Sequence, residues 1–192
     1  MNTLITPAST SSASRPSAPE RTLGHGLALL GAGLMLAAFH RVFDLSVGLP
    51  GHFGVFWMAA IVFARAGSSV AFAGMLAAVG YAAGASAFGA GGHGVFNAPG
   101  YLVCAGAIDL AWWLSPALLR QGSTAALCGA VAFALKPMVL AVLVAALELQ
   151  AGALRHGLGY VVLTHAAFGA CGAAIGAVLF AGAMQPPRTA GR

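Results

Sequence analysis

Six apolar stretches, separated by short polar segments, run along the chain between residues 23 and 184. The charged residues lie almost entirely in the gaps between these stretches. Five of the stretches are long enough, at about 1.5 Å of helix rise per residue, to cross a hydrocarbon core of about 30 Å, and the second is shorter. The pattern predicts six transmembrane helices, at 23–39, 52–64, 69–88, 101–119, 124–149 and 158–184.

The composition supports a fold whose solvent is lipid. Charged residues make up only 7% of the 192 residues, which is too few to cover the surface of a soluble domain of this size. The chain has 27 glycines and abundant alanine, and such small residues let membrane helices pack closely. We therefore predict an all-α integral membrane protein, in which residues 23–184 form one six-helix transmembrane bundle.

The segments outside the bundle indicate its orientation. Residues 1–22 are rich in Ser, Pro, Ala and Thr, which predicts a disordered polar tail, and residues 185–192 form a second tail. The side of the tails carries six arginines, Arg15, Arg21, Arg65, Arg120, Arg188 and Arg192, and the other side carries two, Arg41 and Arg155. This excess predicts that both termini are cytoplasmic. It also explains the net charge of +5 without a nucleic-acid partner.

Polar residues that are not cationic gather on the predicted outer side. They are His40, Asp44, His52, His93, Asn97, Glu148 and His156. The glycine-rich segment 89–100 contains His93 and Asn97 but lacks the Gly-Lys-Ser/Thr ending of a phosphate-binding loop. We interpret it as a flexible outer loop, and His93 and Asn97 are candidates for binding a substrate.

Two ionisable residues, Asp109 and Lys136, lie within predicted membrane helices. Inserting either charge alone costs about 3 kcal/mol or more. We therefore predict that the two side chains contact each other or share one cavity. They form either an ion pair that holds two helices in register or part of a ligand site, and intramembrane charges favour the ligand site.

Three further residues complete the candidate substrate site. His165 lies in the last predicted helix at a depth similar to Asp109 and Lys136, with Tyr160 nearer its outer end. Trp113 follows Asp109 by four positions and shares its helix face. It belongs either to an aromatic belt at the membrane interface or to a stacking wall for a ring-bearing ligand.

Other chemistry is not indicated by the sequence. Cys104, Cys128 and Cys171 all lie inside apolar stretches, where a thiol behaves as a small hydrophobic group, so we predict neither a disulfide nor a metal centre. No nucleophile and base occur at a revealing spacing, and there is no H-E-x-x-H motif. We expect a non-enzymatic protein without a bound cofactor.

The first predicted helix carries small residues at every fourth position, namely Gly24, Ala28 and Ala32. Such a row lets two helices approach closely. It either packs within the bundle or forms a docking surface for another membrane subunit, and the sequence leaves both interpretations open.

Several of these features occur together in one known family. The six spans, the inward termini, the Ala28-x-x-x-Ala32 row, Pro50-Gly51 and the segment 97–101 (Asn-Ala-Pro-Gly-Tyr) resemble the substrate-binding S component of energy-coupling factor (ECF) vitamin transporters. The resemblance covers about residues 22 to 184. It implies a multi-pass subunit of the bacterial inner (plasma) membrane that binds a small vitamin or vitamin precursor near the outer surface.

The resemblance also implies partners and residue roles. Ala28 and Ala32 would dock onto a transmembrane coupling subunit that is driven by two ATPase subunits. The site candidates would be His93, Asn97, Asp109, Lys136 and His165. The metal-transporting branch of the family begins with Met-His, whereas Met1 is followed here by Asn2, which argues against a metal substrate.

Two other classes of protein stay open. One is a b-type haem anchor, in which His40, His93 or His165 would ligate haem from two helices. The other is a structural or assembly membrane protein without a ligand.

Overall fold

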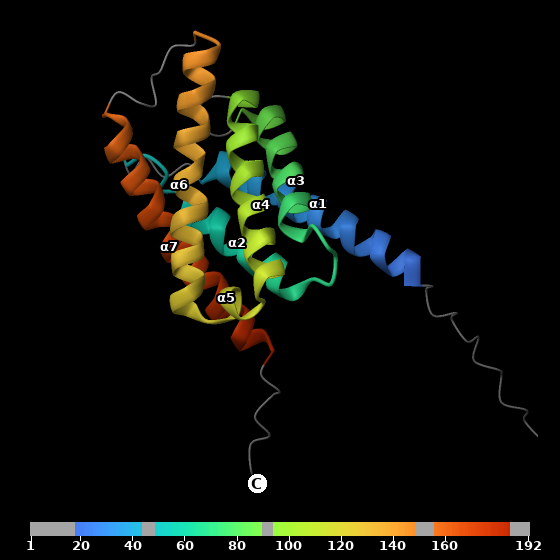
Figure 1. Cartoon of the computed structure of the whole chain (residues 1–192). Coiled ribbons are helices and arrows are strands. Elements are labelled where there is room, and N and C mark those ends of the chain that lie inside the picture. The colour runs from blue at the N-terminus through green and yellow to red at the C-terminus, as the bar shows by residue number, and fades with distance from the viewer. Residues whose placement is uncertain (1–17, 44–48, 90–93, 149–155, 185–192) are drawn as a thin grey trace, which may run out of the picture.

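The computed structural model describes residues 18–43, 49–89, 94–148 and 156–184, and all of its regular structure is helical (Figure 1). The elements are α1 (Ala18–Val42), α2 (Gly54–Gly67), α3 (Ala73–Phe88), the 3₁₀ turn η1 (Gly94–Asn97), α4 (Ala98–Leu114), α5 (Ala117–Arg120), α6 (Gly122–Ala146) and α7 (Leu158–Ala183). The predicted all-α class is confirmed. The six longer helices correspond to the six predicted stretches.

Three predicted boundaries differ from the structure by four or more residues, and one of them is the start of α3 at Ala73, which was expected at residue 69. The helix that we expected at 101–119 ends at Leu114, because Ser115 adopts an extended backbone before Pro116 and the short α5 follows. At the N-terminus, α1 begins at Ala18, inside the segment predicted to be a disordered tail. Pro19 is compatible with a helix there, since a first-turn residue has no helical acceptor for an N–H. Residues 1–17 and 185–192 lie outside the described part.

The helices pack in pairs around α2. α1 lies along α3, α6 lies along α7, and α2 contacts α3, α4, α6 and α7 (Figure 1). Trp57, Met58, Ile61 and Val62 of α2 are almost completely buried. The core of the bundle is therefore built around α2, which has few polar side chains.

Glycines allow the paired helices to approach at backbone distance. Gly80 of α3 lies against the backbone of Leu30 in α1, and Gly129 of α6 lies against the backbone of Gly169 in α7. A side chain at either position would overlap the neighbouring helix, so the small residues take the place of interdigitating side chains. The glycine content of the sequence thus reflects packing inside the bundle.

The long helices carry apolar side chains on the outside. The segment Thr22–Val42 of α1 together with α6 and α7 is long and apolar enough to cross a membrane. Leu127, Val142, Leu163 and Val178 on α6 and α7 are each more than half exposed. The structure thus contains three candidate membrane spans among its described helices.

The other three helices are apolar but shorter. α2, α3 and α4 have 14, 16 and 17 residues, which corresponds to about 21 to 26 Å at 1.5 Å per residue. The loop between α2 and α3 and the break at Ser115 both shorten helices that the sequence had predicted to be longer.

Candidate functional site

A chain of hydrogen bonds connects four helices inside the bundle. Lys136 of α6 donates from Nζ to the hydroxyl oxygen of Tyr101 on α4 (3.1 Å), and the hydroxyl of Tyr81 on α3 donates to the same oxygen (3.3 Å). His40 of α1 contacts the Tyr81 hydroxyl through Nδ1 at 2.6 Å. Which of the two groups donates depends on the tautomer of His40.

Aromatic rings surround these polar groups. The Trp57 ring lies 5.0 Å from Tyr101 and 5.9 Å from Phe133, and the Phe133 ring lies 5.0 Å from His165, measured between centroids. The polar cluster, as we use the term below, consists of His40, Trp57, Tyr81, Tyr101, Lys136 and His165. It brings together side chains from α1, α2, α3, α4, α6 and α7.

Local backbone features position this cluster. Gly51 has a positive φ of 81°, and a Cβ atom there would lie 2.8 Å from the His165 ring. The turn before α2 can therefore cover His165 only with glycine at this position. In the same way, Gly100 leaves room for the stem of Lys136, because a Cβ atom would lie 2.9 Å from its Cγ.

Several donors in the polar cluster are unused. The fully buried Nε1–H of Trp57 has no acceptor among the described residues. The half-buried ammonium of Lys136 makes one hydrogen bond and lies 4.2 Å from the centroid of the Tyr101 ring. Within the described part of the chain it has no carboxylate partner, since the ion pair found there joins Arg65 and Asp109.

Asp109 belongs to a different cluster, so the prediction that it contacts Lys136 or shares its cavity is wrong. Its carboxylate accepts the backbone N–H groups of Gly74 (3.0 Å) and Met75 (2.9 Å) at the start of α3, and it lies 3.5 Å from Arg65. Asp109 follows Tyr101, the contact of Lys136, by eight residues on α4, or about 12 Å. The sequence had placed Arg65 in a loop, whereas it lies in α2 and is only 2% exposed.

The pair of Arg65 and Asp109 has a structural explanation. The guanidinium of Arg65 donates to the backbone carbonyls of Ser68, Val70 and Ala71, which form the turn between α2 and α3. Asp109 caps the N-terminus of α3, where a negative charge is favourable. Together the two side chains fix the path of this turn.

The other candidates divide between the polar cluster and the surface. Lys136 and His165 belong to the cluster, and the buried Asn97 is the N-cap residue of α4, about one helical turn before Tyr101. Trp113 is 52% exposed and its ring contacts Phe72, while Tyr160 is 43% exposed beside His156. These two do not join the cluster, and His93 lies outside the described residues.

Sequence reasoning missed Trp57, Tyr81 and Tyr101, and it noted His40 without selecting it as a site residue. A signal was present, because Tyr81 and Tyr101 are two of only three tyrosines in the chain and both occur in Gly- and Ala-rich apolar stretches. A buried hydroxyl requires a hydrogen-bond partner, so each of these tyrosines predicts a polar neighbour in the core.

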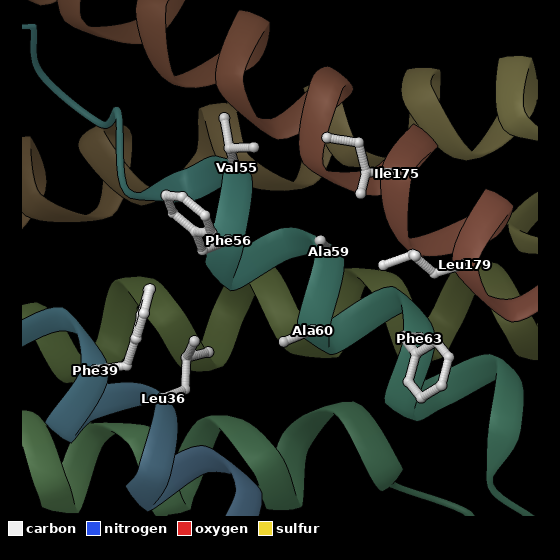
Figure 2. A pocket seen from close by; sticks show the side chains of 9 residues that line it. All are labelled: Leu36, Phe39, Val55, Phe56, Ala59, Ala60, Phe63, Ile175 and Leu179. Carbon is white, nitrogen blue, oxygen red and sulfur yellow. The ribbon is translucent and has the colours of Figure 1, made fainter. Parts of the chain in front are cut away.

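A groove on the outside of the bundle forms a second feature. It has a volume of about 740 Å³ and is lined by apolar side chains of α1, α2 and α7 (Figure 2). The lining residues are Leu36, Phe39, Val55, Phe56, Ala59, Ala60, Phe63, Ile175 and Leu179. Figure 2 shows Phe39 and Leu36 of α1 facing the side chains of α2 across this groove.

The small-residue row of α1 lies beside the groove on the surface. Gly24, Ala28 and Ala32 are exposed, and Leu36, the next residue of the same four-residue spacing, lines the groove. The neighbouring Gly33 is buried against the backbone of α3. α1 therefore packs in the bundle through a different face and leaves this row uncovered by the described helices.

The fold and the clusters define an all-α protein with three helices that could cross a membrane and a polar cluster buried between the helices. Among the described residues, no group of three or more His, Cys, Asp or Glu side chains could hold a metal ion. Comparison with protein-family models, curated proteins and solved structures found no match to this chain.

Proposed function

We propose that the chain is the membrane-embedded substrate-binding subunit of an ECF-type ATP-driven importer for a small vitamin or vitamin precursor. In this proposal all six longer helices span the inner membrane of a bacterium, and both termini are cytoplasmic. The observation that carries the proposal is Lys136, a lysine held among aromatic rings inside an apolar bundle without a carboxylate partner among the described residues.

The cost of this lysine supports a binding role. A lysine at the centre of a membrane helix costs about 3 kcal/mol, and the cost falls when a countercharge or water is present. One hydrogen bond to Tyr101 does not neutralise the charge. An anionic ligand that contacts Lys136 would offset part of this cost on binding.

The position of the cluster fits uptake from outside the cell. His40 and Tyr101 lie within about one turn of the helix ends that face the predicted outer loops, and Trp57 and His165 lie within about two turns. Arg65, which the arginine distribution assigns to the cytoplasmic side, lies at the opposite end of α2 from Trp57, and Arg120, assigned to the same side, lies in α5 between the end of α4 and the start of α6. A solute at the cluster would be closer to the outer surface.

The exposed row on α1 supports docking of a transmembrane coupling subunit. Only 11% of the most apolar window of α1 is buried, and Gly24, Ala28 and Ala32 would let a second helix approach closely. The groove next to Leu36 would accept apolar side chains of the same partner. ATP hydrolysis would take place on the ATPase subunits of the importer.

Solute binding is tested by releasing bound small molecules from the protein. Wild type and Lys136→Met are purified in mild detergent, denatured and analysed by mass spectrometry. We expect a compound that is released from wild type in near-stoichiometric amount and is absent from the variant, although both proteins elute as folded species. A wild-type protein that releases no compound, and is stabilised by none of a panel of vitamins, would contradict solute binding.

Docking is tested with bulky residues on α1. Ala28→Trp and Ala32→Trp should stop association with a coupling subunit and its ATPases, because an indole holds the two backbones apart. Ala167→Trp is the matched control, since Ala167 is an exposed alanine on α7. Association that survives both substitutions on α1, or is lost equally with Ala167→Trp, would argue against this surface.

A further inference from the structure

Two side chains of the polar cluster, Lys136 and Trp57, have N–H groups without an acceptor among the described residues. The ammonium of Lys136 has two further N–H groups, and the Nε1–H of Trp57 is buried without a partner in the described part of the chain. Lys136 and Trp57 therefore have unused donors, while the neutral His165 ring, whose Nδ1–H donates to the Val161 carbonyl, keeps an acceptor at Nε2.

The positive charge of Lys136 also favours an anionic ligand. The chain contains four acidic residues and a single lysine. Asp109 is paired with Arg65, and Glu148 is exposed at the end of α6. The side chains of Glu20 and Asp44 lie outside the described structure. Within that structure, the positive charge of Lys136 is thus not matched by any carboxylate.

We propose that the polar cluster binds a monoanionic solute, specifically a small carboxylate that carries a flat ring. This inference rests on the proposed function and defines the class of substrate. The carboxylate would accept from Lys136 Nζ and Trp57 Nε1, and these unused donors would then make charge-assisted hydrogen bonds. One lysine matches one negative charge, which favours a carboxylate over a phosphate monoester of nearly two charges.

The aromatic rings beside Lys136 favour a solute that carries a flat ring. The ammonium lies 4.2 Å from the Tyr101 ring centroid and 5.8 Å from that of Phe133. These rings are almost completely buried and pack on Trp57, so a flat ring attached to the carboxylate would enter among them only if these side chains moved apart. Amino acids and cationic solutes are disfavoured, because the cluster offers no described carboxylate for an ammonium group.

The inference is tested on the full-length protein in detergent with matched pairs of probes. Benzoate, nicotinate and indole-3-acetate are each compared with the corresponding primary amide, and thiamine serves as a cationic probe. Binding is measured by calorimetry up to about 10 mM, because ligands of this size reach millimolar affinity or better when they fit. We expect at least one carboxylate to bind, and its amide to bind at least about 30-fold more weakly.

Three substitutions assign the binding to the cluster. Lys136→Met should weaken carboxylate binding by about 30-fold or more, and Lys136→Arg should retain most of it. Trp57→Phe keeps a ring but removes the N–H, so it should weaken binding by about tenfold. Trp113→Phe is the control for the loss of an indole and should bind like wild type, because Trp113 lies outside the cluster.

Several results would overturn the anionic class. They are an absence of binding by all three carboxylates, equal binding of acid and amide, and carboxylate binding that Lys136→Met leaves unchanged. Thiamine binding that is independent of Lys136 would also overturn it, while leaving the chain a solute-binding protein. Association with a coupling subunit through α1 is measured separately, so the proposed importer role can stand even if the carboxylates fail.

Discussion

Replacing Asp109 should destabilise the bundle, whereas replacing Lys136 should not. In Asp109→Ala the guanidinium of Arg65 stays buried without its countercharge, and the N–H groups of Gly74 and Met75 lose their acceptor. Removing one partner of a buried ion pair costs about 3 to 5 kcal/mol. Lys136→Met instead removes a charge that has no carboxylate partner among the described residues, so this variant should be at least as stable as wild type.

The measurement is unfolding in mixed micelles, followed by tryptophan fluorescence. Asp109→Asn keeps the shape of the side chain and one acceptor oxygen, so its loss should be smaller, about 2 kcal/mol. The double variant Arg65→Met, Asp109→Leu should recover part of the loss, since no buried charge is left unpaired. An Asp109→Ala protein as stable as wild type, or one that loses only solute binding, would refute the structural role.

Three further predictions concern packing, the hydrogen-bond chain and orientation. Gly80→Ala should lower the stability by about 1 to 3 kcal/mol, because a methyl group would overlap the backbone of α1. Gly24→Ala, at an open position, should be neutral or slightly stabilising. Thermal unfolding of the two variants measures the difference. Tyr81→Phe removes the hydroxyl between His40 and Tyr101 and should cost about 1 to 3 kcal/mol in the same assay, and an unchanged midpoint would contradict the observed bonds. In an otherwise cysteine-free protein, a cysteine at His156 should react with an impermeant reagent in intact cells and one at Arg120 should not; the reverse pattern would invert the proposed topology.

The course of the helices followed largely from the hydrophobic pattern. Long apolar runs defined α6 and α7 to within three residues, although α6 contains Pro137 in its interior. The end of α4 was missed, although Pro116 disfavours helix at the residue before it. Local backbone chemistry at Ser115 therefore overrode hydrophobicity, which continues to Leu119.

The polar contacts depended on spatial information that a single sequence lacks. The sequence indicated that Asp109 needs a partner. Lys136 was predicted as that partner because Asp109 and Lys136 both lie inside apolar stretches. The partner is Arg65, which the charge count had placed in a loop. Depth along a helix gives the height of a side chain and not the direction in which it points. The choice between the two cations required the packing of α2 against α3 and α4.

The packing of the small-residue row on α1 also could not be predicted from the sequence. Gly24, Ala28, Ala32 and Gly33 are all small, and composition does not distinguish the face that packs on α3 from the face that does not. The structure buries Gly33 and exposes the other three. The exposed row on α1 is not covered by the described helices, which is why we place the proposed partner there.

The charged side chains at the two ends of the bundle differ in their partners. At one end, the Arg65 guanidinium is matched by the Asp109 carboxylate and lies 5.1 Å from the Trp112 ring, which also lies 5.1 Å from the Arg120 guanidinium. That cluster holds its own countercharge and requires no ligand. At the other end, Lys136 has hydroxyl and ring contacts but no described carboxylate. A buried charge that is paired internally needs no ligand, whereas the half-buried ammonium of Lys136, which is not paired with a described carboxylate, would be stabilised by a bound anion. The asymmetry therefore favours Lys136 over Asp109 as the residue that contacts solute.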